Sequence, residues 1–375
     1  MEWDLLDVLV HGSPDSVQDA YRRVRLTLGR GDRSAIRRTE ERVYADPTAI
    51  TFDEQGFASV AVGDDEYAGG RFSTPTIQDL RPPQGAGGPV RLWALDRGGP
   101  LTDIGALQAF SSRDTVFQVA SQFNCLEAPG PFLVAVQDYL HDPTQGPRAA
   151  VSAFPAALVR HYAAPGTDGE RFRQTPDRQL NLLADALPDT LAASVRNGYL
   201  QTANITDLRT AADALGSQQE MIRVGVSQDA QVVLGADHDG SVPGRPLITQ
   251  VFTSTLAAGG YGQPDADPAG VEAICRPLLR ASYLGTLLSA LTLGKSRVVL
   301  TLIGGGVFAN PHSLIVDSLA WAMTEVDGLG ALDVVVNARS LEAGPARRHL
   351  GELCREHDGA IVTVPEMTRS AVTGG

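Results

Sequence analysis

One segment, residues 297–312, restricts the fold of this chain more than any other. Residues 297–303 form an apolar, β-branched run with the pattern of a buried strand. Three consecutive glycines follow it. Asn310 and Pro311 then have the sequence of a helix start, with Asn310 at the cap and Pro311 at the first helical position. The segment therefore predicts a strand, a glycine loop and a helix in direct succession.

The glycine loop also predicts an anion site. Because Gly304, Gly305 and Gly306 carry no Cβ atom, a ligand can approach their backbone closely, and the following helix start offers free N–H groups and a positive dipole. The spacing matches neither G-x-G-x-x-G nor G-x-x-x-x-G-K-[ST], which excludes both the Rossmann fingerprint and the P-loop. The alternative is a tight turn between strand and helix that binds nothing.

The composition is that of an ordinary globular protein. With 375 residues, of which 43% are hydrophobic and 20% charged, the chain can bury a full core in one or two domains. Its formal net charge of −13 argues against a nucleic-acid or anionic-membrane partner, since both would be repelled at long range. A small anionic ligand held by local backbone N–H groups is compatible with this charge.

The few cysteines and the single lysine give further limits. Cys125, Cys275 and Cys354 are widely spaced and contain no C-x-x-C pair, so we expect neither a disulfide framework nor a zinc site. The N-terminus does not have the pattern of a signal peptide, and no run of apolar residues has the length of a membrane span. We therefore expect a cytoplasmic protein. Lys295 is the only lysine beside thirty arginines, a bias typical of GC-rich bacterial genomes.

The first 90 residues predict an N-terminal α+β appendage. Residues 14–30 have the periodicity of a helix, and residues 49–52 and 58–62 that of short strands. Thr74 and Pro75 are expected to begin another helix, as cap and first position. The proline- and glycine-rich stretch that follows, residues 81–89, predicts a flexible break before the main domain.

The remainder predicts a three-layer α/β/α sandwich with a mixed sheet over residues 91–367. Strands are expected at 115–120, 222–234, 247–252, 297–303, 332–337 and 360–364, and helices at 131–140, 147–162, 269–293, 311–325 and 345–356. Residues 165–215 are polar with weak helical periodicity and predict a helical insertion. Residues 368–375 are expected to be a disordered tail.

Two loops beyond the glycine loop carry candidate binding residues. Gln122 and Asn124 directly follow the expected strand 115–120, where amides can bind a hydroxyl-rich ligand by paired donors and acceptors. Their alternative role is ordinary cap and turn chemistry. The second loop contains Thr144, Gln145 and Gly146 and again precedes a helix with a proline in its first turn.

Together these loops resemble the macrodomain family, whose α/β fold binds ADP-ribose. The stretch 119–127 is similar to the family's asparagine-bearing strand end, and residues 304–310 are similar to the loop that encloses the diphosphate. With residues 73–75, 144–147, 249–252 and 302–308, the order of loops resembles a divergent branch that includes bacterial effectors removing ADP-ribose from arginine. The resemblance spans about residues 70 to 340. The usual Asn-Ala-Ala-Asn run and early triple-glycine loop are absent, with residues 144–147 in their place.

The resemblance implies ADP-ribose, or a protein carrying it, as the partner. The implied ligand-binding residues lie in the three loops: Gln122, Asn124, Thr144, Gln145, Gly146, Gly304, Gly305, Gly306, Val307, Phe308 and Asn310. Phe308 is expected to stack on a base or ribose, or else to fill the core. We expect no metal and no cofactor.

Acidic residues are the candidate catalytic groups. An ADP-ribose linkage breaks at C1″ of a ribose through an oxocarbenium-like state, which requires a carboxylate to activate water. Asp229, Asp239 and Glu127 are expected to do this and to grip an arginine guanidinium. The alternatives are ordinary turn and strand-end aspartates, or a metal site at residues 237–239. The leading interpretation is an ADP-ribosyl hydrolase favouring arginine. A non-catalytic ADP-ribose-binding module and a hydrolase of another ADP-ribose derivative are the alternatives.

Overall fold

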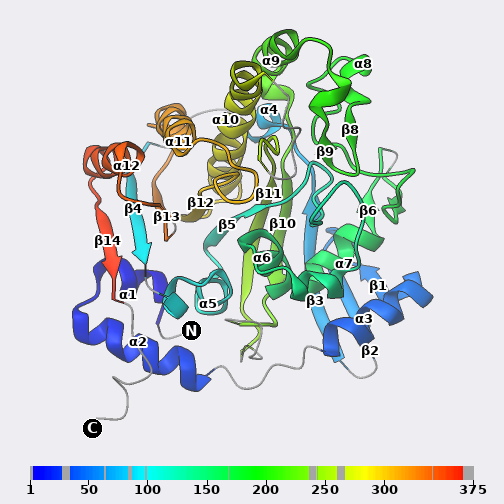
Figure 1. The fold of residues 1–375 in the computed structure, drawn as a ribbon. Coiled ribbons are helices and arrows are strands. Elements are labelled where there is room, and N and C mark those ends of the chain that lie inside the picture. Colours follow the sequence, from blue (N-terminus) through cyan, green and yellow to red (C-terminus); the bar gives the residue numbers. More distant parts are fainter. Residues whose placement is uncertain are drawn as a thin grey trace.

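The chain folds around one ten-stranded mixed sheet with helices packed on both faces (Figure 1). The computed structural model describes residues 3–27, 34–62, 65–82, 87–97, 99–167, 169–235, 242, 244–259, 267–339 and 341–365. The strand order in the sheet is β1-β2-β3-β10-β11-β5-β12-β13-β4-β14. Its members are β1 (Ile50–Phe52), β2 (Ala58–Val62), β3 (Asp65–Ser73), β4 (Val90–Arg97), β5 (Thr115–Ala120), β10 (Gly225–Gln231), β11 (Leu247–Thr253), β12 (Arg297–Thr301), β13 (Leu332–Asn337) and β14 (Ile361–Val364).

The helices form the outer layers of the fold (Figure 1). One layer contains α4 (Ile77–Leu80), α9 (Leu208–Ser217), α10 (Pro268–Thr292), α11 (His312–Val326) and α12 (Pro345–Glu356), and the other contains α5 (Ile104–Ala109), α6 (Gln145–Ser152) and α7 (Phe154–Tyr162). The N-terminal helices are α1 (Leu5–His11), α2 (Pro14–Thr27) and α3 (Ser34–Ala45). The predicted α/β sandwich with a mixed sheet is thus confirmed.

The central strands are buried on both faces, as their β-branched runs require. Val298, Val299 and Leu300 of β12 are at most 1% exposed. Val299 is in register with Phe117 of β5 on one side and Val335 of β13 on the other, and all three strands are parallel. The carboxyl ends of β5, β12 and β13 therefore meet at one edge of the sheet, where ligand sites form in such folds.

The N-terminal segment is not a separate unit beside this sheet. β3 pairs antiparallel with β10, and β2 with β3, so β1–β3 extend the main sheet instead of ending at a boundary near residue 90. Strand β4 was not predicted at all, although it pairs with β13 and β14. It lies beside the glycine-rich stretch that we interpreted as a break.

Several predicted boundaries differ from the structure. The cap of α4 is Thr76, not Thr74, because Thr76 completes a capping box with Asp79. The cap of α11 is Pro311, not Asn310, whose side chain braces the preceding loop. The expected single helix 147–162 is α6 and α7, interrupted at Ala153 (φ −111°, ψ 54°).

The expected helical insertion is mostly irregular. It contains the short hairpins β6–β7 (Ala164–Pro165 and Arg171–Phe172) and β8–β9 (Val195–Arg196 and Tyr199–Leu200), the single turn α8 (Asp189–Ala192), and α9 at its end. The predicted tail 368–375 lies outside the described residues. None of the helices in the described part of the chain has the length and apolar character needed to cross a bilayer.

Candidate active site

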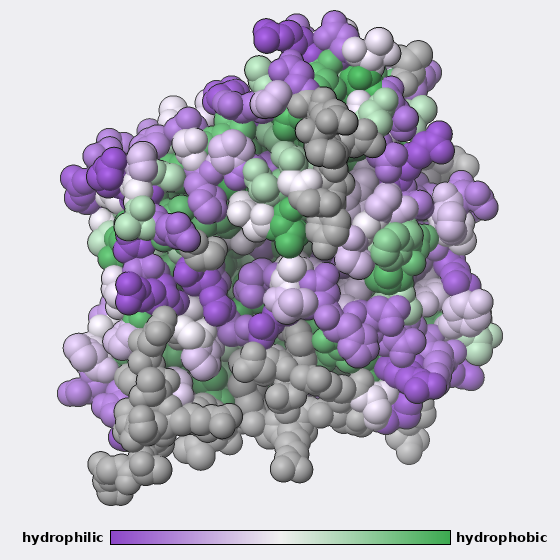
Figure 2. All heavy atoms as spheres, in the orientation of Figure 1, coloured by the Kyte–Doolittle hydropathy of each residue, from purple (hydrophilic) through white to green (hydrophobic). Residues whose placement is uncertain are grey.

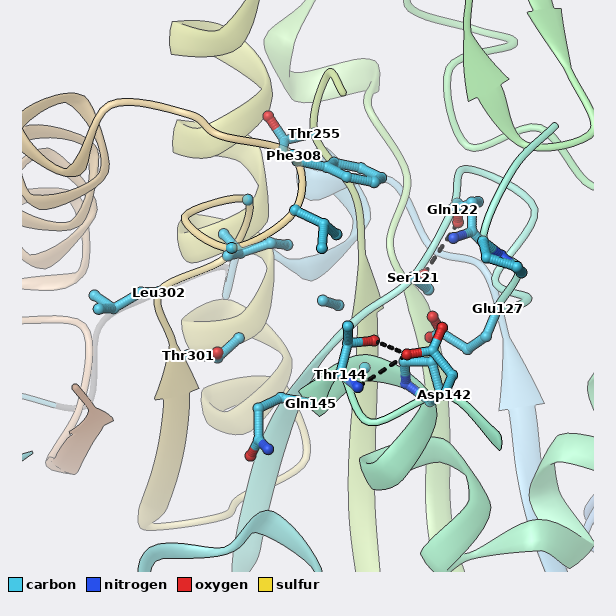
Figure 3. Close-up of a pocket in the computed structure, with 18 of the residues that line it drawn as sticks. Ser121, Gln122, Glu127, Asp142, Thr144, Gln145, Thr255, Thr301, Leu302 and Phe308 are labelled. Carbon is cyan, nitrogen blue, oxygen red and sulfur yellow. Dashed lines mark hydrogen bonds between the residues drawn. The ribbon is translucent and has the colours of Figure 1, made fainter. Parts of the chain in front are cut away.

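A cavity of about 310 Å³ lies at the carboxyl-end edge of the sheet, above β5, β12 and β13 (Figure 3). This volume is within the range of small-molecule sites. On the described part of the face in Figure 2, apolar residues are scattered among hydrophilic ones and form no extended patch. The lining comes from six segments: Ala120, Ser121, Gln122, Glu127, Ala128 and Pro129; Asp142 to Pro147; Tyr199; Thr255; Thr301 to Gly304 with Gly306, Val307 and Phe308; and Asn337 with Arg339.

The turn after β5 places the carboxyl group of Glu127 in this cavity. Its backbone folds back on itself, since Gln122 N–H donates to Leu126 O (3.0 Å) and Leu126 N–H donates to Asn124 Oδ1 (3.0 Å). Cys125, at the tip, has a left-handed φ of 62°. The Glu127 N–H donates to Tyr139 Oη (2.9 Å) from the segment before α6. Asn124 is therefore a buried brace of the turn and does not line the cavity as we expected.

Glu127 has the environment of a carboxylic acid that keeps its proton. Its side chain is 4% exposed, and Oε1 is fully buried without a hydrogen-bond partner. Burial raises the pKa of Glu127 well above its ordinary value, the charge of Arg160 lowers that pKa, and the charge of Asp142 raises it further. A buried carboxyl group of this kind can donate a proton near neutral pH.

The start of α6 forms the wall next to Glu127. Thr144 donates from both N–H (2.9 Å) and Oγ1 (2.6 Å) to Asp142 Oδ1, and Figure 3 shows these groups pointing toward Glu127. A Cβ atom on Gly146 would lie 2.5 Å from Ala120 O and 3.0 Å from Glu127 Oε2. Only glycine therefore lets the helix start approach the acid this closely. Thr144 makes no side-chain cap bond to the helix.

The glycine loop forms part of the opposite wall, and its three glycines differ. Gly304 has a φ of 75°, and a Cβ atom there would lie 2.6 Å from Thr255. Gly305 does not line the cavity, because the direction of its missing Cβ points at His312 Nε2, 2.9 Å away. Gly306 lines the cavity, and a side chain there would meet open space. Gly304 and Gly306 thus line the cavity, with open space only at Gly306, and Gly305 does not line it as we expected.

Asn310 supports this loop from behind. Its Nδ2 donates to Leu256 O (2.8 Å), and its Oδ1 accepts from Thr255 Oγ1 (2.8 Å). The side chain is 3% exposed and is absent from the cavity lining. Asn310 therefore fixes the loop and is not in a position to contact a ligand, contrary to our expectation.

Three residues of the cavity lining have a buried amide oxygen without a hydrogen-bond partner. Gln122 Nε2 donates to Ala128 O (3.2 Å), whereas Gln122 Oε1 is buried without a partner. Gln145 Oε1 and Asn337 Oδ1 are buried and unpartnered in the same way. Because a buried acceptor without a donor costs about 1–3 kcal/mol, these atoms favour a ligand rich in hydroxyl or N–H groups.

Two aromatic rings stand at the side of the cavity. The Phe308 and Tyr199 ring centroids are 5.8 Å apart with the planes tilted by 50°. Tyr199 comes from the β8–β9 hairpin, and its Oη donates to Ala128 O (2.7 Å). The hairpin thereby completes the cavity wall, although the sequence indicated only an insertion there.

Asp229 lies at the opposite edge of the sheet, so its predicted grouping with Glu127 is wrong. Arg113 precedes β5 and donates to both carboxylate oxygens of Asp229 (3.0 and 2.7 Å), and Lys295 precedes β12 with Nζ 3.4 Å from Oδ1. These are the amino ends of strands whose carboxyl ends carry the cavity. Asp239 lies outside the described residues, as do Asp237 and His238. Within the described ranges, no group of three or more His, Cys, Asp and Glu side chains could hold a metal ion.

Of the predicted site residues, the structure brings nine together around the cavity: Gln122, Glu127, Thr144, Gln145, Gly146, Gly304, Gly306, Val307 and Phe308. Sequence reasoning missed Asp142, Tyr199, Asn337 and Arg339. The signal for Asp142 was its position two residues before Thr144, a spacing typical of a turn in which Asp accepts from the backbone. No local signal pointed to Tyr199.

The sequence matches no family model and no curated protein. The chain is similar in structure to poly(ADP-ribose) glycohydrolase from Thermomonospora curvata bound to the inhibitor ADP-HPD, with 14% identity, a TM-score of 0.44, and 86% of this chain and 98% of that chain covered. It is also similar to poly(ADP-ribose) glycohydrolase from Deinococcus radiodurans in apo form, with 13% identity, a TM-score of 0.42, and 76% and 93% covered.

Proposed function

We propose that this protein is an ADP-ribosyl hydrolase that releases ADP-ribose from a modified protein. The observation that carries the proposal is Glu127, a buried acid whose Oε1 has no hydrogen-bond partner and which lines a cavity between two loops that precede helices. Of the three predicted catalytic acids, the proposal keeps Glu127 and does not depend on Asp229 or Asp239.

The cavity walls suit the parts of ADP-ribose. The diphosphate would lie between Gly306 and the start of α6, where close backbone approach and the helix dipole favour anions. Arg339, at the exposed rim, adds a positive charge. The ribose hydroxyls would donate to the unpartnered oxygens of Gln122, Gln145 or Asn337, and a ring would stack on Phe308.

The proposed reaction uses the raised pKa of Glu127 directly. The protonated carboxyl group donates its proton to the leaving atom as the bond from that atom to C1″ breaks, and the resulting carboxylate then accepts a proton from the attacking water. Asp142 stays on the same wall, oriented by Thr144, and can polarise the water or contact the leaving group. The products are ADP-ribose and the unmodified side chain.

Fewer observations support arginine as the side chain that carries the ADP-ribose. The acidic group that favoured arginine is not assembled, since Asp229 lies at the far edge of the sheet. Asp142 is the remaining carboxylate beside Glu127 that could accept guanidinium N–H groups. Arginine is therefore the first linkage to test, together with serine, glutamate and ribose–ribose linkages.

A module that binds ADP-ribose without cleaving it is the second candidate. The three unpartnered amide oxygens favour it, because they account for binding and do not require an acid. It predicts that Glu127→Gln binds ADP-ribose as tightly as the parent, and that neither protein releases ADP-ribose from a substrate.

One incubation series distinguishes the two. The protein is mixed with arginine-, serine- and glutamate-linked ADP-ribosylated proteins and with poly(ADP-ribose), and released ADP-ribose is quantified by mass spectrometry. We expect release from at least one of these substrates. If ADP-ribose binds in calorimetry and no substrate releases it, the hydrolase proposal is wrong and the binding module stands.

A further inference from the structure

Arg160 is a fully buried cation beside the turn that carries Glu127. It lies on α7 with 0% of its surface exposed. Its guanidinium carbon is 3.6 Å from the centroid of the Phe252 ring, and its Nε–H donates to Cys125 O (3.0 Å). A second side chain ties these elements together, since Gln174 Nε2 donates to both Asn124 O and Arg160 O (3.0 Å each).

The guanidinium is only partly satisfied. Nη1 and Nη2 are both buried and have no hydrogen-bond partner, and the same is true of Glu127 Oε1. A buried charged group without partners is costly, so a nearby opposite charge is needed to offset it. Glu127 is the acid that the cavity offers on this side. Arg160 and Glu127 do not bond each other in the structure; Arg160 acts on Glu127 through its charge, from its position on Cys125 O in the same turn.

Three further titratable groups in and beside this turn are neutral at physiological pH. Burial raises the pKa of Cys125 to about 12 and also raises that of Tyr139 above its ordinary value. Burial lowers the pKa of His161, which is hydrogen-bonded to Tyr139 Oη (2.7 Å), to about 3.

Arg160 itself remains charged, because burial lowers its pKa only to about 10. Its positive charge lowers the pKa of Glu127, whereas the negative charge of Asp142 raises that pKa.

We propose that Arg160 is a positioning residue whose fixed positive charge stabilises the carboxylate form of Glu127, so that this buried acid can both release and recover a proton. The inference rests on the proposed function. In the first step the Glu127 proton moves to the leaving atom as its bond to C1″ breaks, which leaves a carboxylate opposite Arg160. In the second step water attacks C1″, and its proton returns to that carboxylate. Without Arg160, burial alone would favour the protonated form and hinder the release of the proton.

The test measures the protonation of Glu127 directly. Carbon-13 NMR of glutamate carboxyl groups, assigned with Glu127→Gln, gives the pKa of Glu127 in the parent, in Arg160→Gln and in Arg160→Lys. Arg160→Gln removes the charge and keeps a donor for Cys125 O, whereas Arg160→Lys keeps the charge. We expect Arg160→Gln to raise the pKa of Glu127 by about one unit or more, and Arg160→Lys to leave it close to the parent value. An unchanged pKa in folded Arg160→Gln would overturn the inference.

Kinetics supply the second readout. Arg160→Gln should move the alkaline limb of the kcat profile to higher pH and lower kcat at neutral pH by about tenfold, with the Kd for ADP-ribose within twofold of the parent. Arg160→Lys should restore both. If Arg160→Gln and Arg160→Lys lost kcat equally while the alkaline limb of the kcat profile stayed at the parent's pH, Arg160 would have only a structural role. Should Arg160→Gln not fold, Phe252→Leu, which frees the guanidinium, is expected to raise the pKa of Glu127 by a smaller amount, and no change there counts against the inference. A parent without turnover refutes the proposed function, while the NMR titration still decides about Arg160.

Discussion

Glu127 and Asp229 are two buried acidic residues at opposite edges of one sheet, and they differ in the hydrogen-bond partners of their carboxyl groups and in the direction of their pKa shifts. Asp229 is held by two bonds from Arg113 and by Lys295, and although burial opposes it, these partners lower the pKa of Asp229 below its ordinary value. Glu127 has an unpartnered oxygen, and burial raises its pKa. The comparison teaches that a satisfied acid supports the fold, while an unsatisfied acid in a cavity is a candidate for chemistry.

Backbone strain does not separate the two regions. Cys125, two residues before Glu127, has a φ of 62°, and Asp229 itself has a φ of 56°. Both positions are left-handed and are uncommon for residues other than glycine. The left-handed residue lies in a turn after β5 in one case and at an irregularity inside β10 in the other, so backbone conformation alone does not distinguish the candidate active site.

The largest expected effect is on turnover. Glu127→Gln keeps the shape of the side chain and removes the acid, so kcat should fall by about 10²–10⁴-fold, the usual contribution of a general acid or base. Asp229→Asn is the matched control at the other edge, where kcat should stay within about twofold because the cavity is untouched. Both are measured by release of ADP-ribose. Similar losses in the two variants would break the comparison.

The next effect concerns binding at the glycine loop. Gly306→Val places a branched side chain into the open space of the cavity, and we expect the affinity for ADP-ribose to fall by about thirtyfold or more, which corresponds to about 2 kcal/mol. Gly216→Val is the control, since a side chain on that exposed glycine of α9 also meets open space. Calorimetry on both variants measures the Kd for ADP-ribose. Unchanged binding in Gly306→Val would place the diphosphate elsewhere.

A smaller effect is expected on stability at the Asp229 edge. Asp229→Asn leaves Lys295 and Arg113 without their carboxylate and should reduce the free energy of unfolding by about 1–3 kcal/mol at neutral pH. Because the pKa of Asp229 is lowered in the fold, this contribution is present above the ordinary pKa of 3.8 and is lost as the pH falls through the folded value. Urea titrations at several pH values should show the difference between parent and variant shrinking in acid.

At Glu127 the pH dependence of the free energy of unfolding is expected to have the opposite sign, which sharpens the comparison. Because the pKa of Glu127 is raised in the fold, its contribution is present below the ordinary value of 4.5 and is lost as the pH rises through the folded value. Relative to the parent, Glu127→Gln should therefore gain stability with rising pH, by at most about 1.4 kcal/mol per pH unit. The same urea titrations measure it. If Glu127→Gln instead lost stability relative to the parent as the pH rose, as Asp229→Asn is expected to, the assignment would be contradicted.

The sequence was sufficient where one local pattern determined the result. The β-branched runs of β5, β12 and β13 and the glycine loop were predicted from neighbouring residues, and the structure confirms the strands. The turn holding Glu127 was found for the same reason, because polar residues directly follow a buried strand. Even here only one of the two amides expected at the site lines the cavity, namely Gln122, while Asn124 braces the turn.

Long-range pairing was not readable from the sequence. The partner of Asp229 is Arg113, separated from it by 116 positions, and no local pattern shows which edge of the sheet they share. Tyr199 reaches Phe308 from a hairpin inside a polar insertion for the same reason. Likewise, that Gly306 and not Gly305 faces the cavity depends on His312, whose ring covers Gly305.

The pairing of β3 with β10 determines how the chain can be divided in the laboratory. A truncation at residue 90 would remove β1–β3 and leave the backbone donors and acceptors of β10 exposed along a new sheet edge. An open edge of this kind pairs readily with other chains. Expression of residues 91–375 alone should therefore give aggregates instead of a smaller active protein, and the N-terminal strands are needed to keep the protein monodisperse.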